Sequence, residues 1–234
     1  MLDQRATEPE LLDRLDTGGQ EVERSLWVCA KANRYFGGAR VARKFLRAEL
    51  ARLPGDRPLR VLDIGAGDAS IALAMSRWAR GQGRNVEWVC LERSPHAAGL
   101  ARQAVAAAND SRVRIIEGDV LTHQPDQPYD YAIGSLFFHH LADDEIVALL
   151  ERLRTFVRRG VLVNDLRRCG SCYRLWHAIS RLFSPVVRHD LLLSIRRGFR
   201  PSELRRVLGR VNGGVSVSVT RHWFCRLAGV IRFE

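Results

Sequence analysis

The chain has 234 residues, 46% of them hydrophobic, and a formal net charge of +11. This length and composition suit one globular domain with a full core and exclude a wholly disordered chain. No apolar run reaches the roughly 18 to 20 residues of a membrane span, and the acidic start is unlike a signal peptide, so we expect a cytoplasmic protein.

The basic residues are almost all arginine, since lysine occurs only at Lys31 and Lys44. The arginines are spread along the chain, which favours a solvated basic surface. Two denser groups, one around 167–168 and one around 196–197, leave an anionic partner open.

The chain contains five cysteines, an odd number without an export signal, which favours free thiols over a disulfide framework. We expect Cys29, Cys90 and Cys225 in the core because their neighbours are apolar. Cys169 and Cys172 are expected to be free thiols at a helix start, with a zinc site or a thioredoxin-like redox pair as the alternatives.

The segment 1–54 has helical patterns near 8–17, 21–35 and 39–53. Helices that precede an α/β sheet often cover its ligand-binding edge. We therefore predict that residues 1–54 form an N-terminal helical lid.

Strand and helix patterns alternate from residue 59 onward, which predicts a parallel, doubly wound α/β sheet with right-handed crossovers. The expected strands are 59–64, 86–92, 113–117, 129–136 and 160–165, and the expected helices between them are 68–80, 95–108 and 143–157.

The C-terminal part departs from this alternation. Residues 171–184 predict an amphipathic helix, an irregular stretch follows to residue 200, and 201–208 predicts another helix. Two further strands, 215–219 and 223–231, are joined by a short link. Such a hairpin would add one antiparallel strand to the sheet.

The stretch Val61–Ser70 predicts a buried strand that turns sharply into a helix. Because ligands bind at the carboxyl ends of parallel strands, its glycines predict a nucleotide-like cofactor. Three features favour S-adenosylmethionine (SAM) over a dinucleotide: Ser70 replaces the third glycine, Asp63 would repel a pyrophosphate, and the terminal hairpin is present. Glu92, at the end of the second strand, can accept the hydrogens of ribose hydroxyls.

These residues, together with Gly118–Val120 and the strand 129–133, resemble the class I SAM-dependent methyltransferases. The resemblance implies a Rossmann-like, seven-stranded sheet whose last strand is antiparallel, in a domain at 55–234 with a helical cap insertion at about 167–200. It implies that Asp63 and Gly65 lie by the methionine part of SAM, Glu92 by the ribose, and Asp119 with Val120 by the adenine. The full set of expected cofactor residues is Asp63, Gly65, Ala66, Gly67, Glu92, Arg93, Asp119, Val120 and Ser135.

The segment Ser135–Leu141 is similar to the corresponding part of ubiquinone/menaquinone-biosynthesis-like methyltransferases. This implies methyl transfer to a small, aromatic hydroxylated acceptor such as a phenol, quinol or polyketide-like compound, with O-methylation slightly ahead of C-methylation. The alternatives are an RNA or protein methyltransferase, a non-catalytic SAM-binding protein and a nicotinamide-dependent oxidoreductase.

Nucleic acid is disfavoured as the acceptor. Residues 134–137 lack an Asn/Asp-Pro-Pro motif, no lysine follows Lys44, and no cysteine lies next to the fourth strand. A membrane surface, contacted by the helix near 171–183, remains a weaker alternative. No metal site is predicted, and no pattern in the sequence indicates the oligomeric state.

His139 and His140 follow the fourth strand at the ligand edge, and we predict that one of them acts on the acceptor as a general base. The alternative is that one is a core or capping histidine and the other is exposed. The remaining residues predicted to contact the acceptor, with plain core packing or a surface loop as their alternatives, are Tyr35, Phe36, Phe138, Asp165, Trp176 and His189.

Overall fold

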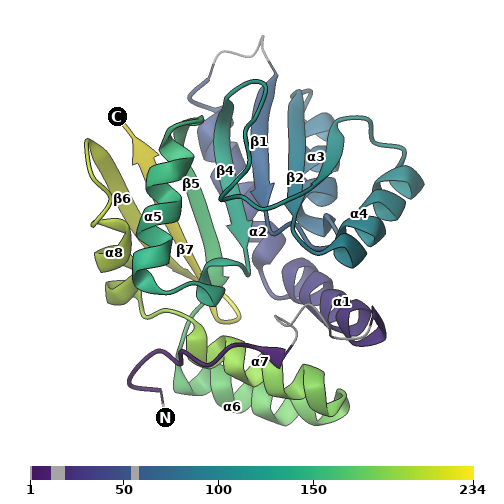
Figure 1. The fold of residues 1–234 in the computed structure, drawn as a ribbon, viewed down its shortest axis with the longest axis vertical. Coiled ribbons are helices and arrows are strands. Elements are labelled where there is room, and N and C mark those ends of the chain that lie inside the picture. The colour runs from purple at the N-terminus through teal and green to yellow at the C-terminus, as the bar shows by residue number, and fades with distance from the viewer. Residues whose placement is uncertain (1, 12–18, 54–57) are drawn as a thin grey trace.

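The computed structural model describes residues 2–11, 19–53 and 58–234. Its centre is a seven-stranded sheet in the order β3-β2-β1-β4-β5-β7-β6 (Figure 1). The strands are β1 Leu59–Ile64, β2 Val86–Glu92, β3 Val113–Glu117, β4 Tyr129–Ser135, β5 Val157–Leu166, β6 Val215–His222 and β7 Arg226–Phe233.

Strands β1 to β5 pair in parallel, and β7 lies antiparallel between β5 and β6. This confirms the predicted Rossmann-like sheet with an antiparallel last strand. The central strands β1 and β4 are buried on both faces apart from the partly exposed Arg60, as expected of the middle of a parallel sheet covered by helices.

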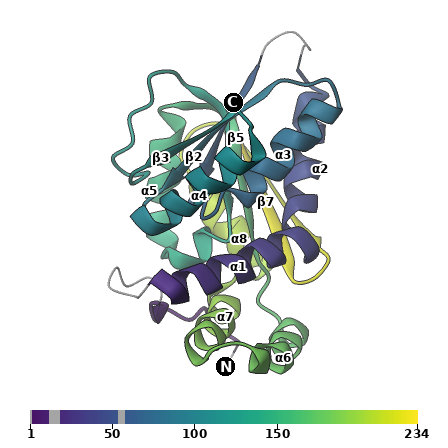
Figure 2. The same ribbon diagram turned by 90° about the vertical axis from the view of Figure 1, so that its right-hand side faces the viewer.

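Helices cover both faces of the sheet (Figures 1 and 2). The helices with their bounds are α1 Gly19–Tyr35, α2 Gly38–Leu50, α3 Ser70–Gly81, α4 Pro95–Ala108, α5 Asp143–Arg154, α6 Gly170–Ile179, α7 Pro185–Arg197 and α8 Pro201–Leu208. Helices α2 and α3 pack on one face through residues such as Phe45 and Met75. Helices α5 and α8 pack on the other face.

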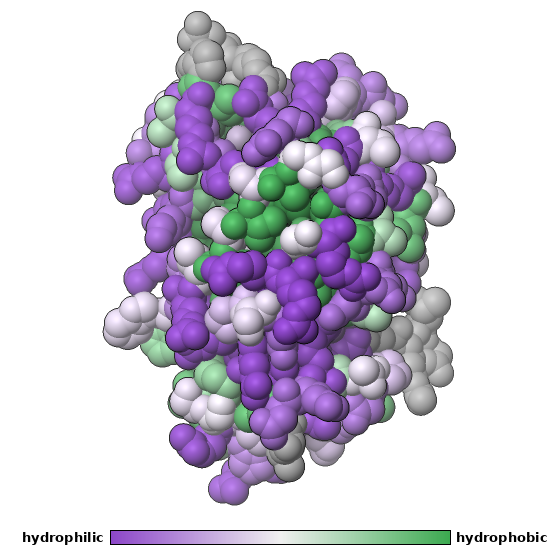
Figure 3. Space-filling model, turned by 90° about the vertical axis from the view of Figure 1, so that its left-hand side faces the viewer, coloured by the Kyte–Doolittle hydropathy of each residue, from purple (hydrophilic) through white to green (hydrophobic). Residues whose placement is uncertain are grey.

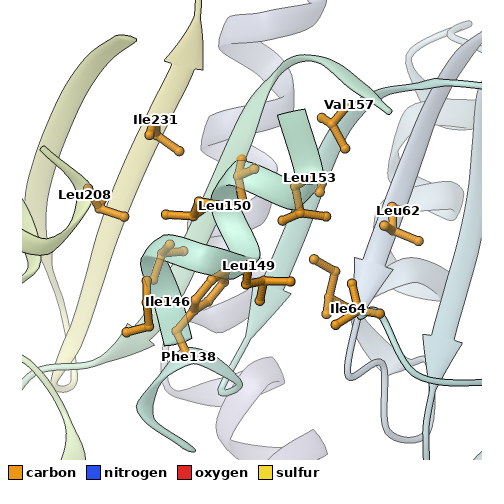
Figure 4. Packing of buried hydrophobic residues seen from close by; sticks show 14 of the residues in the cluster. Leu62, Ile64, Phe138, Ile146, Leu149, Leu150, Leu153, Val157, Leu208 and Ile231 are labelled. Atoms are coloured by element: carbon orange, nitrogen blue, oxygen red, sulfur yellow. The ribbon is translucent and has the colours of Figure 1, made fainter. Parts of the chain in front are cut away.

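The core under α5 shows how this packing works (Figure 4). Ile146, Leu149, Leu150 and Leu153 follow the three-to-four-residue spacing of one helix face and are all buried against the sheet. The 3-10 helix η2, Phe138–His140, follows β4 and places Phe138 in the same cluster. This packing fixes the position of η2 at the carboxyl end of β4.

The C-terminal half differs from the expectation at three places. The helix expected at 171–184 ends at Ile179 and is followed by a 3-10 helix, Ser180–Leu182. Residues 185–197 form α7 instead of an irregular stretch, with Ser184 as its N-cap and Pro185 in its first turn. Strand β6 extends to His222, so the hairpin turn is at 223–225 and not at 220–222. Phe224 and Cys225 adopt positive φ in this turn, which the sequence does not signal because neither is glycine.

The segment between β5 and α8 forms a cap below the carboxyl ends of the strands (Figures 1 and 2). It contains α6, the 3-10 helix η3, Ser180–Leu182, and α7. The chain leaves and re-enters the core at neighbouring positions, because Phe199 N–H donates to the Leu166 carbonyl and Arg168 N–H donates to that of Phe199. The two ends of the cap are therefore held together where the cap joins the core.

Strand β6 is the edge of the sheet on the face shown in Figure 3, most of which is hydrophilic around one hydrophobic area. Along β6, Ser216, Ser218 and Thr220 are exposed, while the valines between them pack partly against the core. Within the part of the chain that the structure describes, no helix has the length and apolar content needed to cross a membrane.

Candidate active site

A cavity of about 900 Å³ lies at the carboxyl ends of the strands. Its walls come from the β1–α3 turn, the end of β2, η2, helix α1 and helix α7. The predicted cofactor residues Gly65, Ala66, Gly67, Glu92, Arg93, Asp119, Val120 and Ser135 line it, as do His139, His140 and Trp176. One continuous space thus joins the predicted donor and acceptor residues.

The glycine turn forms one wall of this cavity. Gly65 and Gly67 both have positive φ, at 61° and 56°. A Cβ on Gly65 would lie 2.6 Å from Cδ2 of Phe137, so this position has no room for a side chain. The turn thereby brings bare backbone to the cavity, as a bound adenosyl compound requires.

Asp63 lies behind this turn at the end of β1 and is almost fully buried. It does not itself line the cavity. Its Oδ2 has no hydrogen-bond partner among the described residues. Burial, followed by the negative charges of Glu92 and Asp68, raises the pKa of Asp63 to about 8. An orphaned buried carboxyl at this place fits a cationic ligand such as SAM.

Glu92 joins the glycine turn to the start of α4. Its Oε2 accepts the Gly67 N–H and its Oε1 accepts the Ser94 N–H, both at 2.9 Å. Each oxygen keeps lone-pair capacity for a further donor. The carboxylate is therefore positioned for ribose hydroxyls by two backbone amides.

Ser135 lies in a buried polar network below the cavity. Its Oγ donates to Oδ1 of Asn33 on α1 and accepts from the amide of Asn164 on β5. Asn33 Oδ1 also accepts from the buried guanidinium of Arg226 on β7. The network ties helix α1, a part of the predicted lid, to three strands.

His139 is the most constrained side chain at the acceptor end. Its Nδ1 lies 2.7 Å from Asp165 Oδ1, and its Nε2 lies 3.5 Å from Glu10 Oε1. Asp165 also accepts the backbone N–H groups of His139 and Leu166. Although burial opposes the charged ring, Asp165 and Glu10 raise the pKa of His139 to about 9. The imidazole and both carboxylates are buried.

Arginines from two distant segments hold the backbone of η2. Arg197 on α7 donates to the carbonyls of His139 and His140, and Arg5 donates to the carbonyl of Leu141. Arg5 also donates to the carbonyl of Arg197 and pairs with Asp143. The arginine pair 196–197, which left an anionic partner open in the sequence, thus contains one buried structural arginine.

The other predicted acceptor residues are not gathered at the cavity. Tyr35 is exposed, Phe138 lies in the core, and Asp165 lies behind His139. Phe36 packs against Trp176 with ring centroids 4.8 Å apart. The side chain of His189 is half exposed and hydrogen-bonds Asp190. Of the acceptor residues predicted outside η2, only Trp176 lines the cavity.

The expectation that all cysteines are free thiols is wrong. Cys172 on α6 forms a disulfide with Cys225 in the β6–β7 turn, 53 residues further along the chain. Cys169 Sγ lies 2.6 Å from Cys172 Sγ, while Cys29 and Cys90 are free. The positive-φ turn at 224–225 carries Cys225 to α6, a contact that sequence spacing could not reveal.

The cavity residues that the sequence analysis missed include Glu10, Asp190 and Ser194. Ser194 Oγ donates to Glu10 Oε1 at 2.6 Å, and Asp190 Oδ1 accepts the Leu11 N–H. A helical pattern through residues 185–197, with polar residues four apart at Asp190 and Ser194, was the available signal. Glu10 gave none, because its position depends on the path of the N-terminal segment.

Comparisons with known proteins support this assignment of the donor end. Residues 61–160 match the model of a methyltransferase domain family. A search of curated protein sequences found no match.

Several solved structures share the fold. Magnesium protoporphyrin IX methyltransferase from Synechocystis PCC 6803 with bound S-adenosylhomocysteine (SAH) has a TM-score of 0.64 and 16% identity over 95% of this chain and 97% of that one. Mitomycin 7-O-methyltransferase has a TM-score of 0.68 and 20% identity over 96% and 61%. A plantazolicin methyltransferase, in complex with a triazolic substrate analogue and SAH, has a TM-score of 0.65 and 14% identity over 92% and 98%.

The matched domain begins two residues before Asp63 and includes the glycine turn, Glu92 and Asp119. These are the same residues whose geometry fits an adenosyl ligand. The domain match shows a methyltransferase domain in this chain, and the fold and this fit agree with a domain that binds SAM.

Proposed function

We propose that this enzyme transfers the methyl group of SAM to a small aromatic acceptor at a hydroxyl oxygen. The observation that carries the proposal is the single cavity of about 900 Å³, which the glycine turn lines at one end and His139, His140 and Trp176 line at the other. A volume of this size suits a cofactor together with a small second substrate. SAM supplies the electrophilic methyl group.

The acceptor-end side chains support a hydroxylated acceptor. A hydroxyl becomes a better nucleophile as it loses its proton, and an imidazole within hydrogen-bond reach can take or hold that proton. His139 is held at Nδ1 by Asp165, and its Nε2 lies 3.5 Å from Glu10 Oε1, so the His139–Glu10 pair is the group that can hold the acceptor proton. His140 lines the same part of the cavity.

The apolar walls support an aromatic acceptor. Cavity residues that come from α1 and from the cap include Leu26, Val28, Trp176 and Ile195. The fold is shared with a mitomycin O-methyltransferase, which supports oxygen as the methylated atom. An RNA or protein acceptor receives no such support from the mostly apolar walls.

The first test is native mass spectrometry of the purified protein, which should detect SAM or SAH and any acceptor that copurifies. Purified phenols, quinols and polyketide-like aromatics are then assayed with SAM. For an accepted compound, His139→Ala should lower kcat by about 10²–10⁴-fold and leave SAH affinity within twofold. Methylation of RNA or protein in place of every small aromatic would overturn the proposal.

A further inference from the structure

Three side chains at the acceptor end form a cluster with the chemistry of a metal site. The ligand atoms of Glu10, His139 and His140 all lie within 4.8 Å of one another. Glu10 comes from the N-terminal segment and the two histidines from η2, so no spacing in the sequence indicates the cluster. All three residues line the cavity.

The distances fit a single ion. Atoms bound at about 2.0–2.2 Å from one metal in tetrahedral geometry lie roughly 3.3–3.6 Å apart. Glu10 Oε1 and His139 Nε2 are 3.5 Å apart. Little movement of these two side chains would be needed to bind an ion between them.

His139 and Glu10 each have a further hydrogen-bond partner, as metal-binding histidines and carboxylates usually do. Asp165 Oδ1 lies 2.7 Å from His139 Nδ1, which leaves Nε2 as the atom directed toward Glu10. Carboxylate–histidine–metal arrangements use this outer hydrogen bond to fix the ring. Ser194 Oγ likewise donates to Glu10 Oε1 at 2.6 Å.

We propose that Glu10, His139 and His140 bind one divalent transition-metal ion of the zinc type. Two imidazoles and one carboxylate favour such ions over Mg²⁺ and Ca²⁺, which prefer oxygen ligands. Three protein ligands leave a coordination position open toward the cavity, as in catalytic zinc sites. That this position receives the acceptor oxygen rests on the proposed function, whereas binding of the ion does not.

The test is a titration of chelator-treated protein with Co²⁺, followed by visible absorption. We expect one equivalent to bind with ligand-field bands and without the near-ultraviolet bands of cobalt–thiolate bonds, which would indicate binding at a free thiol such as Cys169 instead. Glu10→Gln and His140→Ala should each weaken Co²⁺ binding tenfold or more. Asp165→Asn, which removes only the outer partner, should weaken it by about 10–100-fold.

The matched control is His222→Ala, which removes a histidine on β6 outside the cavity and should leave Co²⁺ affinity unchanged. SAH binding is measured for every variant, so that a folding defect is recognised. If one of Glu10→Gln and His140→Ala fails to fold, the other tests the metal site. Failure of the wild-type protein to bind Co²⁺ below about 1 mM, thiolate bands, or affinity unaffected by both Glu10→Gln and His140→Ala would overturn the metal site. None of these results would affect the methyltransferase proposal, because SAH binding and methyl transfer are measured separately.

Discussion

The two ends of the cavity differ in how their buried carboxyl groups are compensated. At the donor end, Asp63 has an oxygen without a described partner and a raised pKa. At the acceptor end, His139 lies between Asp165 and Glu10, and its charge and hydrogen bonds hold the pKa of both carboxyls low although burial opposes this. The buried carboxyl of the donor end thus lacks a partner that a cationic ligand can supply, whereas the two carboxyls of the acceptor end are compensated by His139.

The two ends also differ in how the chain builds them. Donor residues lie at the ends of consecutive strands, where neighbouring sequence fixes their positions. The acceptor end combines the N-terminal segment, η2, the end of β5 and helix α7. Damage to a single contact should therefore remain local at the donor end and spread between segments at the acceptor end.

Asp63→Asn should have the largest effect. The pKa of Asp63 is raised from its ordinary 3.8 to about 8, so the folded protein holds a proton that the unfolded chain releases. Wild-type stability should therefore fall as pH rises from about 4 to 8, by on the order of 5 kcal/mol. Asn cannot ionise, so the variant should melt about 10 °C higher at pH 8 and bind SAM about tenfold more weakly.

Asp110→Asn is the opposite control. Asp110 is also buried, but Ser76 and Arg112 hold its pKa low against the effect of burial. Replacing it should lower the melting temperature at neutral pH. Thermal unfolding from pH 5 to 8.5 measures both variants. If Asp63→Asn melted no higher than wild type at pH 8, the donor end would not carry an uncompensated charge.

Cys172→Ser tests the long-range construction of the acceptor end. The disulfide closes 53 residues of chain, and its loss should cost up to about 4 kcal/mol through the entropy of the unfolded chain. Cys169→Ser leaves the Cys172–Cys225 bond intact and should change stability far less. Melting temperatures with and without reductant measure this, and SAH affinity should remain within threefold in both variants. A large loss of SAH affinity in Cys172→Ser would contradict the view that the donor and acceptor ends of the cavity are built independently.

Glu92→Gln tests the donor end by itself. The N–H groups of Gly67 and Ser94 donate to different oxygens of Glu92, and a glutamine keeps only one oxygen to accept them. The substitution also removes the negative charge expected to bind the ribose hydroxyls. Isothermal titration should show SAM and SAH affinity reduced by about 10–100-fold. Glu87→Gln, on the same strand outside the cavity, is the control.

Local and long-range construction also explains what the sequence could predict. The sheet, the glycine turn, Glu92 and Asp119 follow from patterns within single strand–turn–helix units. The sequence places His139 and Asp165 near the ends of two strands, but it does not predict that they touch, because their contact depends on the β4–β5 register. Glu10, Arg197 and the Cys172–Cys225 bond depend on where α7, the N-terminal segment and a non-glycine turn lie in space.

Arg5→Ala should have the smallest effect and probes how strongly the N-terminal segment supports η2. Arg5 bonds the carbonyls of Leu141 and Arg197 and pairs with Asp143, whose carboxylate is half exposed. Partly exposed bonds of this kind contribute about 1 kcal/mol in total. The melting temperature should fall by about 2–4 °C, and turnover of an identified acceptor should fall severalfold because η2 carries His139. SAH affinity should stay unchanged, since no donor residue contacts Arg5.

Arg24→Ala, which removes an exposed ion pair with Glu21 on α1, is the control and should change neither quantity. Equal losses of SAH affinity and turnover in Arg5→Ala would mean that the N-terminal segment supports both ends of the cavity, and the division between them would have to be abandoned.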